Sequence, residues 1–229
     1  MRLNESGTTP STTRYTIRAV AEELFAQKRI DGVTTRALAE AAGVNMAAIN
    51  YHYGSKENLT LAIFRDVARR TVLRRHNSLD EIEAQAAAQN STPVIHDVIN
   101  AFVDAYVNED SPRTGFLLAH LVLQHRVRPT DWTRAVVLEE LDGFAIRYIK
   151  VLHRAAPHLS ETEIHWRYNL MVGTVMMSVS GHKSDKRMKE LSNDLCAPED
   201  LAELKDELVA FLVNSFGQPE TAEINTPLK

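Results

Sequence analysis

The stretch from Gly43 to Ser55 constrains the fold of this chain more than any other part of its sequence. A helical pattern that includes Ala39 stops at Gly43, and a glycine there permits a positive φ angle and a sharp turn. Ile49 then supplies an apolar anchor for a short second helix. A small residue, a glycine and a branched apolar residue at this spacing are the signature of a helix-turn-helix.

The short helix after Gly43 lacks an apolar stripe on its open face. The residues that we expect on that face are Asn45, Met46, Ala47, Asn50, Tyr51 and His52. Such side chains can donate to phosphates or reach base edges in a DNA major groove. Ser55 is placed to cap the following helix, whose first turn holds Lys56. The alternative is a buried turn in which Tyr51 and Tyr53 fill a core, although a core has little need for so many polar neighbours.

Length and composition exclude several classes of protein. A chain of 229 residues can bury a sizeable core without covalent staples. Its single cysteine, Cys196, excludes an intrachain disulfide and a cysteine-rich metal site. No charged-then-apolar leader opens the chain, and no apolar run reaches the roughly 18–20 residues that span a bilayer. We therefore expect a cytoplasmic protein without a membrane role.

The net charge of −4 conceals a division between the two parts of the chain. Residues 1–76 hold 12 Lys and Arg against 7 Asp and Glu, whereas residues 77–229 hold 14 against 23. A basic front and an acidic remainder indicate that only the front meets a polyanion such as DNA. The alternative is two unequal but solvated surfaces.

The front of the chain predicts three short helices behind a flexible N-terminal arm, residues 1–12. Apolar residues at helical spacing predict a first helix from Thr13 to Lys28. Thr34 or Thr35 then caps a second helix, Arg36 to Ala42, and can present its hydroxyl to a phosphate. With the helix after Gly43, these elements make a helix-turn-helix domain of residues 13–54, with Tyr53 as an aromatic plug.

The remainder predicts a larger helical domain, residues 55–217, which opens with a linking helix over residues 55–77. Five arginines, Arg65 to Arg75, lie on the side of this helix away from its apolar positions, and we interpret that side as solvated or paired with the other domain. Further helices are predicted over residues 93–108, 114–125, 131–156, 160–180 and 199–216, with a long polar connection over residues 181–198 and a flexible tail over residues 218–229. No strand alternation persists, so the expected fold class is all-α.

Residues 13–64 resemble the N-terminal domain of the tetracycline-repressor (TetR) family of bacterial regulators. The segments that carry the resemblance are Leu24-Phe25, Gly32-Val33-Thr34-Thr35, Ala39-x-x-Ala42-Gly43-Val44 and Tyr51-His52-Tyr53-Gly54-Ser55-Lys56-Glu57. The resemblance implies a homodimer whose third helices enter successive major grooves of an inverted-repeat operator. It also implies a dimer interface made by the last two long helices, and an unidentified small-molecule effector that binds the C-terminal domain and alters the spacing of the two reading helices.

Position by position, the resemblance implies DNA contacts from the second and third helices and from the start of the linking helix. The implied residues are Thr34, Thr35, Arg36, Asn45, Met46, Ala47, Asn50, Tyr51, His52 and Lys56. The chain departs from the family pattern at Asn50, where a tyrosine is usual, at Tyr53, which replaces a phenylalanine, and at Met46, which replaces a polar residue. An asparagine can bind adenine through two hydrogen bonds, and a methionine can contact a thymine methyl.

Two further sets of residues are candidates in the C-terminal domain, each with packing in the protein core as the alternative. Aromatic and histidine side chains that can line an effector pocket are Phe102, Tyr106, Phe116, His120, Trp132, Phe144, Tyr148 and Trp166. Residues placed to form the dimer interface are Leu170, Gly173, Thr174, Met177, Leu204, Leu208, Phe211 and Leu212.

Metal and enzyme functions are disfavoured. The pairs His120/His125 and His153/His158 are spaced by five residues, which separates them on a helix, and only Glu161/His165 has the spacing of a helical ligand pair. The chain lacks a glycine-rich phosphate loop, a nucleophile elbow and a paired-carboxylate motif. The sequence thus predicts a DNA-binding regulator, in the usual case a repressor, with no metal or cofactor. The alternatives are a helical protein-interaction module that does not bind DNA and, less favoured, a helical enzyme.

Overall fold

The computed structural model describes residues 10–28, 30–107, 112–181 and 186–217. Every regular element within these ranges is helical, so the predicted all-α class is confirmed. The elements are α1 (Pro10–Lys28), α2 (Thr35–Ala41), α3 (Met46–Tyr53), α4 (Lys56–Ala88), α5 (Ile95–Asp104), α6 (Pro112–Val127), α7 (Asp131–Val136), the π-helical turn η1 (Val137–Leu141), α8 (Asp142–Ala155), α9 (Glu161–Gly181), α10 (Lys186–Leu191) and α11 (Leu201–Ser215).

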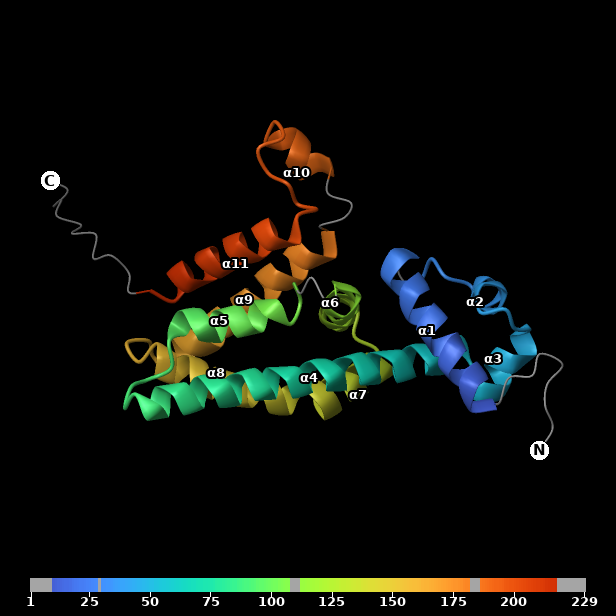
Figure 1. The fold of residues 1–229 in the computed structure, drawn as a ribbon, viewed down its shortest axis with the longest axis horizontal. Coiled ribbons are helices and arrows are strands. Elements are labelled where there is room, and N and C mark those ends of the chain that lie inside the picture. The colour runs from blue at the N-terminus through green and yellow to red at the C-terminus, as the bar shows by residue number, and fades with distance from the viewer. Residues whose placement is uncertain (1–9, 29, 108–111, 182–185, 218–229) are drawn as a thin grey trace, which may run out of the picture.

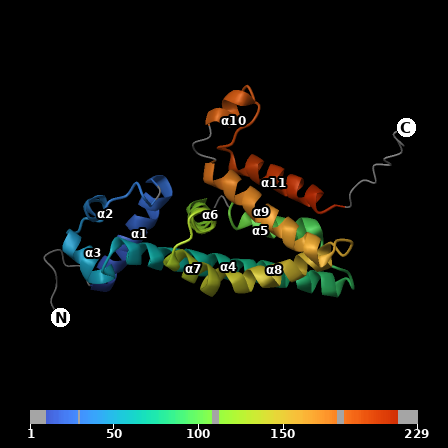
Figure 2. The ribbon, with the colours of Figure 1, turned by 180° about the vertical axis from the view of Figure 1, so that it is seen from behind.

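The long helix α4 is the axis on which the other elements are arranged. Helices α1, α2 and α3 gather at its N-terminal end, α5, α7 and α8 lie along the rest of its length, and α9 and α11 form the next layer away from α4 (Figure 1). Seen from behind, α7 and α8 run along α4, and α6 lies between α1 and the C-terminal helices (Figure 2). One helix therefore runs from the N-terminal helices deep into the C-terminal bundle.

The N-terminal helices pack through the apolar stripe that the sequence predicts. Ile17, Ala21 and Phe25 of α1 are at most 1% exposed, and Leu38 of α2 and Ile49 of α3 are fully buried. The first helix begins at Pro10, so the last three residues of the predicted arm are helical. The rest of that arm, residues 1–9, and the predicted tail, residues 218–229, lie outside the described residues.

The linking helix is longer than predicted. The expected end near residue 77 is wrong, because α4 continues without interruption to Ala88 and has 33 residues. At 1.5 Å per residue it is about 50 Å long. The connection over residues 181–198 also differs from the prediction, since it contains the short helix α10.

Arginines of α4 pair with carboxylates on both sides of the domain boundary. Arg70 lies 3.3 Å from Glu22 of the N-terminal domain, as the interpretation of an interdomain-paired face anticipates, whereas Arg65 and Arg69 pair within the C-terminal domain. Arg65 lies 2.6 Å from Glu139, and Arg69 lies 2.7 Å from Glu140. Both glutamates belong to η1, the π-helical turn that interrupts the predicted helix over residues 131–156. These two pairs join α4 to the segment that leads into α8.

Arg75 contradicts the prediction that the arginines of α4 face away from the core. Only 5% of its surface is exposed. Val67, Thr71 and Leu79 are also buried, and residues four apart on a helix lie on the same face. Arg75 is thus part of the inward stripe of α4.

Two helical glycines provide a matched test of how closely α6 approaches the turn that follows α5. A Cβ atom on Gly115 would lie 2.1 Å from the carbonyl oxygen of Tyr106, whereas a Cβ on Gly143 of α8 would meet no atom within 4 Å. We expect Gly115→Ala to lower the free energy of unfolding by about 2 kcal/mol or more, because α6 and the Tyr106 backbone must separate. Gly143→Ala should raise it by about 0.5–1 kcal/mol through helix propensity. Urea denaturation of both variants measures the difference, and equal stabilities would contradict the close approach at Gly115.

Candidate nucleic-acid interface

Side-chain caps fix where α2 and α3 begin. Thr34 is the N-cap of α2, and its Oγ1 accepts a hydrogen bond of 3.1 Å from the Ala37 amide. Asn45 is the N-cap of α3, and its Oδ1 accepts a hydrogen bond of 2.8 Å from the Ala48 amide. Between the two helices, Gly43 has a φ angle of 63°, which confirms the predicted turn. The caps and the glycine together define a helix-turn-helix.

Helix α3 is held on one side and open on the other. Ile49 is fully buried, whereas Tyr51 is 81% exposed and Met46 is 52% exposed. Asn45, Ala47 and Asn50 are exposed as well, and the half-buried His52 ring contacts the edge of Tyr51 with 5.1 Å between ring centroids. The residues predicted to read DNA on this helix therefore share one accessible surface, which we name the α3 face (Asn45, Met46, Ala47, Asn50, Tyr51 and His52).

The residues predicted to contact phosphates border the α3 face and differ in accessibility. Thr34 and Arg36 are exposed, and Thr35 is half-buried as the first residue of α2. The Nζ of Lys56 donates a hydrogen bond of 2.7 Å to the carbonyl of Ile30, in the loop before α2. An ammonium group has three donors, so two remain for a phosphate. Lys56 therefore has a structural contact in addition to its predicted role.

Tyr53 is the plug between α1 and α3. Its ring packs against the core, and its hydroxyl donates a hydrogen bond of 2.8 Å to the carbonyl of Arg14. The Arg14 guanidinium lies 5.5 Å from the ring centroid. Burial raises the pKa of Tyr53, which keeps the hydroxyl protonated as the donor. At the start of α4, Ser55 accepts a hydrogen bond of 3.1 Å from Asn58, which confirms the predicted cap.

The residues predicted to line an effector pocket do not all come together. Phe102, Tyr106 and Phe144 surround the Arg75 guanidinium, and Tyr148 packs against Phe102 with 5.2 Å between ring centroids. The other predicted members lie elsewhere: Phe116 pairs with His120 at 4.3 Å, Trp132 stacks on Phe64 at 5.8 Å, and Trp166 is 64% exposed.

We name Phe102, Tyr106, Phe144, Tyr148 and Tyr168 the aromatic cluster. Sequence reasoning missed Tyr168 and also missed Arg75, whose guanidinium lies among these rings. The ring of Tyr168 lies 6.0 Å from that of Tyr148 and 6.3 Å from that of Phe102. The available signal for Arg75 was its spacing of four residues from Thr71 and eight from Val67, which places it on the apolar side of α4. This spacing was overlooked because the neighbouring arginines of α4 lie on its exposed side.

The predicted dimer residues divide between the surface and the core of the protomer. Leu170, Met177 and Phe211 are 62–66% exposed. Gly173, Thr174 and Leu204 are half-buried, whereas Leu208 and Leu212 are buried inside the protomer at 6% and 2% exposure. The side chains of Leu208 and Leu212 therefore point into the protomer, away from the exposed surface of Leu170 and Phe211.

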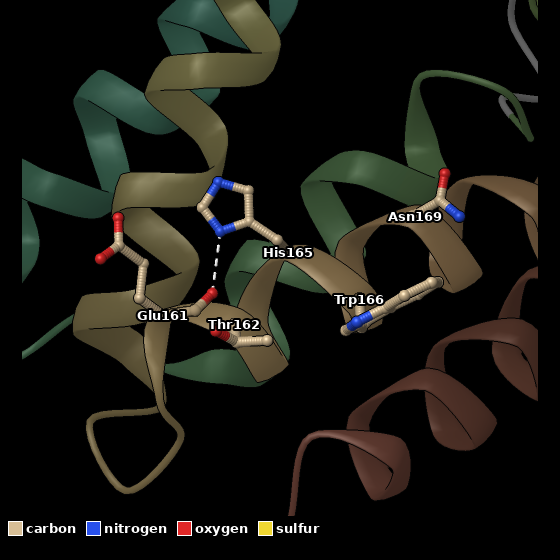
Figure 3. A pocket seen from close by; sticks show the side chains of 5 residues that line it. All are labelled: Glu161, Thr162, His165, Trp166 and Asn169. Carbon is tan, nitrogen blue, oxygen red and sulfur yellow. Dashed lines mark hydrogen bonds between the residues drawn. The ribbon is translucent and has the colours of Figure 1, made fainter.

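Large apolar side chains are exposed on α9 and α11, next to two hollows. A groove of about 830 Å³ is lined by Met177, Leu195 and Phe211, among others. Further along α9, Trp166 lies beside an open hollow together with Thr162, His165 and Asn169 (Figure 3). The Nδ1 of His165 is 2.8 Å from the Glu161 carbonyl oxygen, so the ring folds back on its own helix. We name Trp166, Leu170, Met177 and Phe211 the α9/α11 face.

Within the described ranges no group of three or more His, Cys, Asp and Glu side chains is arranged to hold a metal ion. In the same part of the chain no helix is both long and apolar enough to cross a membrane.

Two family models match the chain. Residues 17–63 match the model described as "Bacterial regulatory proteins, tetR family", and residues 100–214 match "Tetracyclin repressor-like, C-terminal domain". The two matches together cover the helix-turn-helix and the bundle from α5 to α11.

Sequence relatives match in the N-terminal part. The HTH-type transcriptional repressor AcnR of Corynebacterium glutamicum is 40% identical over 78 residues, which are 34% of this chain and 42% of AcnR. AcnR of Corynebacterium efficiens is 38% identical over the same length. The chain thus spans less than half the length of the curated relatives that it matches.

Solved structures share the fold over most of the chain. A putative tetR family regulator from Shewanella sp. PV-4 is 15% identical, with a TM-score of 0.55 over 89% of this chain and 97% of its own. FadR of Bacillus subtilis, solved with stearoyl-CoA, is 16% identical, with a TM-score of 0.55 over 88% and 98%. Because the two family models match residues 17–63 and 100–214, the chain belongs to the TetR family of bacterial regulatory proteins.

Proposed function

We propose that the protein is a dimeric, sequence-specific DNA-binding regulator, and that it represses transcription until a small molecule binds its C-terminal domain. The observation that supports this most directly is the α3 face. A helix anchored by the buried Ile49 presents Asn50 and Tyr51 to solvent at the basic end of the chain. The similarity of this region to the repressor AcnR supports repression over activation.

The proposed DNA contacts follow from which polar atoms are not already hydrogen-bonded within the protein. Asn50 and Tyr51 are exposed, and Asn50 can bind adenine through its amide. The Oδ1 of Asn45 accepts the cap hydrogen bond, so this residue meets DNA through its amide N–H groups. Arg36 and the two remaining donors of Lys56 supply positive charge to the phosphates on either side.

The α9/α11 face is the proposed dimer interface. An isolated protomer leaves Trp166, Leu170, Met177 and Phe211 each more than 60% exposed. Apolar patches of this kind on a soluble protein mark contact surfaces. A two-fold axis through this face pairs each patch with its copy and carries one α3 face to each half of an inverted repeat. Leu208 and Leu212 then support the interface from inside each protomer.

The proposed effector acts through α4. This helix begins beside α3 and reaches Arg75, 19 residues further, which is about 28 Å at 1.5 Å per residue. Its pairs with Glu139 and Glu140 connect it to η1, which continues into α8. A ligand that moves α8 therefore shifts α4 and the two α3 faces. FadR, which shares the fold, was solved with a small molecule, stearoyl-CoA.

Salt dependence of binding to the upstream region of its own gene tests the proposal. With Arg36 and Lys56 from each protomer, about four cations meet phosphates, so affinity should fall about a hundredfold for a fourfold rise in salt. Fluorescence anisotropy at two salt concentrations measures this, with an unrelated fragment of equal length as the control. Equal affinity for both fragments would contradict sequence-specific recognition. Absence of saturable binding to any fragment of the source genome would favour the protein-interaction module.

A further inference from the structure

Arg75 is a buried cation in the centre of the C-terminal bundle. Its guanidinium carbon lies 4.4 Å from the ring centroid of Tyr106, 4.7 Å from that of Phe102 and 5.3 Å from that of Phe144. The residue is 5% exposed. Arginine is rarely buried unless a counter-charge accompanies it. Three aromatic faces attract the cation but accept none of its hydrogen bonds in the plane of the group.

The guanidinium lacks the partners that its neighbours on α4 have. Its Nε and Nη2 are enclosed and have no hydrogen-bond partner. Arg65, Arg69 and Arg70 each lie within 3.3 Å of a glutamate oxygen. Among the residues that the structure describes, no carboxylate lies within 4.0 Å of Arg75. Buried donors without acceptors are uncommon in native proteins and point to an absent partner.

The positions of Nε and Nη2 of Arg75 indicate the chemistry of the absent partner. Nε and Nη2 lie on one edge of the planar guanidinium, and their two parallel N–H bonds match the two oxygens of a carboxylate. The rings of Phe102, Tyr106 and Phe144 lie around the guanidinium, and Tyr148 and Tyr168 pack against those rings. A partner that satisfies both features has a carboxylate at one end and an apolar body.

The tyrosines of the enclosure add polar groups without adding charge. The Tyr148 hydroxyl already donates a hydrogen bond of 2.9 Å to the Val98 carbonyl. Burial raises the pKa of Tyr168 to about 12, so its hydroxyl is neutral near pH 7 and does not serve as the anion for Arg75. The negative charge must therefore come from outside the aromatic cluster.

We propose that Arg75 is the residue that recognises the effector, and that the effector is an apolar carboxylate whose anionic end pairs with Nε and Nη2 while the aromatic side chains enclose its body. This inference rests on the proposed function, in which the C-terminal domain binds a small molecule. The aromatic cluster is closed here, so binding displaces rings on α5 and α8. Because α8 follows directly on η1, that displacement reaches Glu139, Glu140 and their arginines on α4.

Calorimetry on the full-length protein without DNA tests the proposal, with benzoate and octanoate as aromatic and aliphatic probes. Their neutral analogues, benzamide and octanamide, keep the body and remove the charge. At least one carboxylate should bind in the millimolar range or tighter, about ten- to a hundredfold more tightly than its amide. Saturable binding of neither carboxylate, or equal binding of acid and amide, would overturn the proposal.

Substitution of Arg75 separates recognition from a structural role. Arg75→Met keeps the length of the side chain and removes the unpaired charge, so the unliganded variant should melt at the same or a higher temperature than the wild type. Its preference for carboxylate over amide should disappear, and Arg75→Lys should retain only part of it. Arg74→Met, at the exposed neighbouring position, is the matched control and should keep the full preference.

Two results would assign Arg75 to structure alone. One is a lower melting temperature for Arg75→Met, and the other is an unchanged carboxylate preference in that variant. Because neither experiment contains DNA, a failure here leaves operator binding unaffected. Conversely, a failure of operator binding would not alter the carboxylate titration.

Discussion

Replacing Asn50 and Tyr51 together by alanine will weaken specific operator binding by about thirtyfold or more while leaving the fold intact. Both side chains are exposed on α3, and neither belongs to the core that Ile49 anchors. A side chain that reads a base edge contributes about 1–3 kcal/mol of discrimination. A dimer loses the contribution twice, so the loss is about 2–6 kcal/mol, or about thirtyfold to ten-thousandfold in affinity. Anisotropy titration against the operator fragment measures it.

The same titration distinguishes reading from general electrostatics. The variant should keep its weak affinity for an unrelated fragment, because Arg36 and Lys56 remain. Arg74→Ala, which removes an exposed charge from α4, is the control for loss of positive charge and should bind the operator like the wild type. If Asn50→Ala/Tyr51→Ala bound the operator with wild-type affinity, the α3 face would not be the reading surface.

Leu170→Glu will convert the protein to a monomer and thereby weaken operator binding. Leu170 is 62% exposed on α9 at the proposed interface. Two-fold symmetry places the new carboxylate in the interface twice, where it is desolvated without a partner, and a buried unpaired charge costs about 3–5 kcal/mol. The dimer dissociation constant should rise at least about a hundredfold. Analytical ultracentrifugation measures it over a range of protein concentrations.

An exposed leucine of the same accessibility supplies the control. Leu73 on α4 is 64% exposed and does not belong to the α9/α11 face. Leu73→Glu should therefore leave both the dimer and the melting temperature unchanged. A dimer that survives Leu170→Glu would place the interface elsewhere on the protomer. Dissociation by both variants would mean that α4 also contributes to it.

Much of the helix-turn-helix could be predicted because its signals are local. The turn depends on a positive φ angle at Gly43, and the starts of α2 and α4 depend on the hydroxyls of Thr34 and Ser55 a few residues from their amide partners. Such caps act within one turn of a helix and need no distant contact. The all-α class likewise follows from apolar spacing along each segment.

The aromatic cluster could be predicted only in part. Phe102, Tyr106, Phe144 and Tyr148 meet, but Trp132 joins Phe64 and Trp166 faces solvent. Helical spacing says which residues share a face and not which other helix covers that face. Helical spacing also did not distinguish Leu208 from Phe211 on α11, although Leu208 is 6% exposed and Phe211 is 62% exposed.

The sequence by itself determined the helical class, the turn at Gly43, the caps at Thr34 and Ser55 and the open α3 face, because each depends on residues within one or two turns of one another. Tertiary structure alone decided the course of α4 beyond residue 77 and the burial of Arg75. It also decided which apolar residues of α9 and α11 are exposed and which are buried. Those outcomes depend on how α5, α6, α7 and α8 pack on α4, and on how α9 and α11 pack on those helices. The physical reason is that burial is a property of two surfaces, and one chain segment specifies only its own.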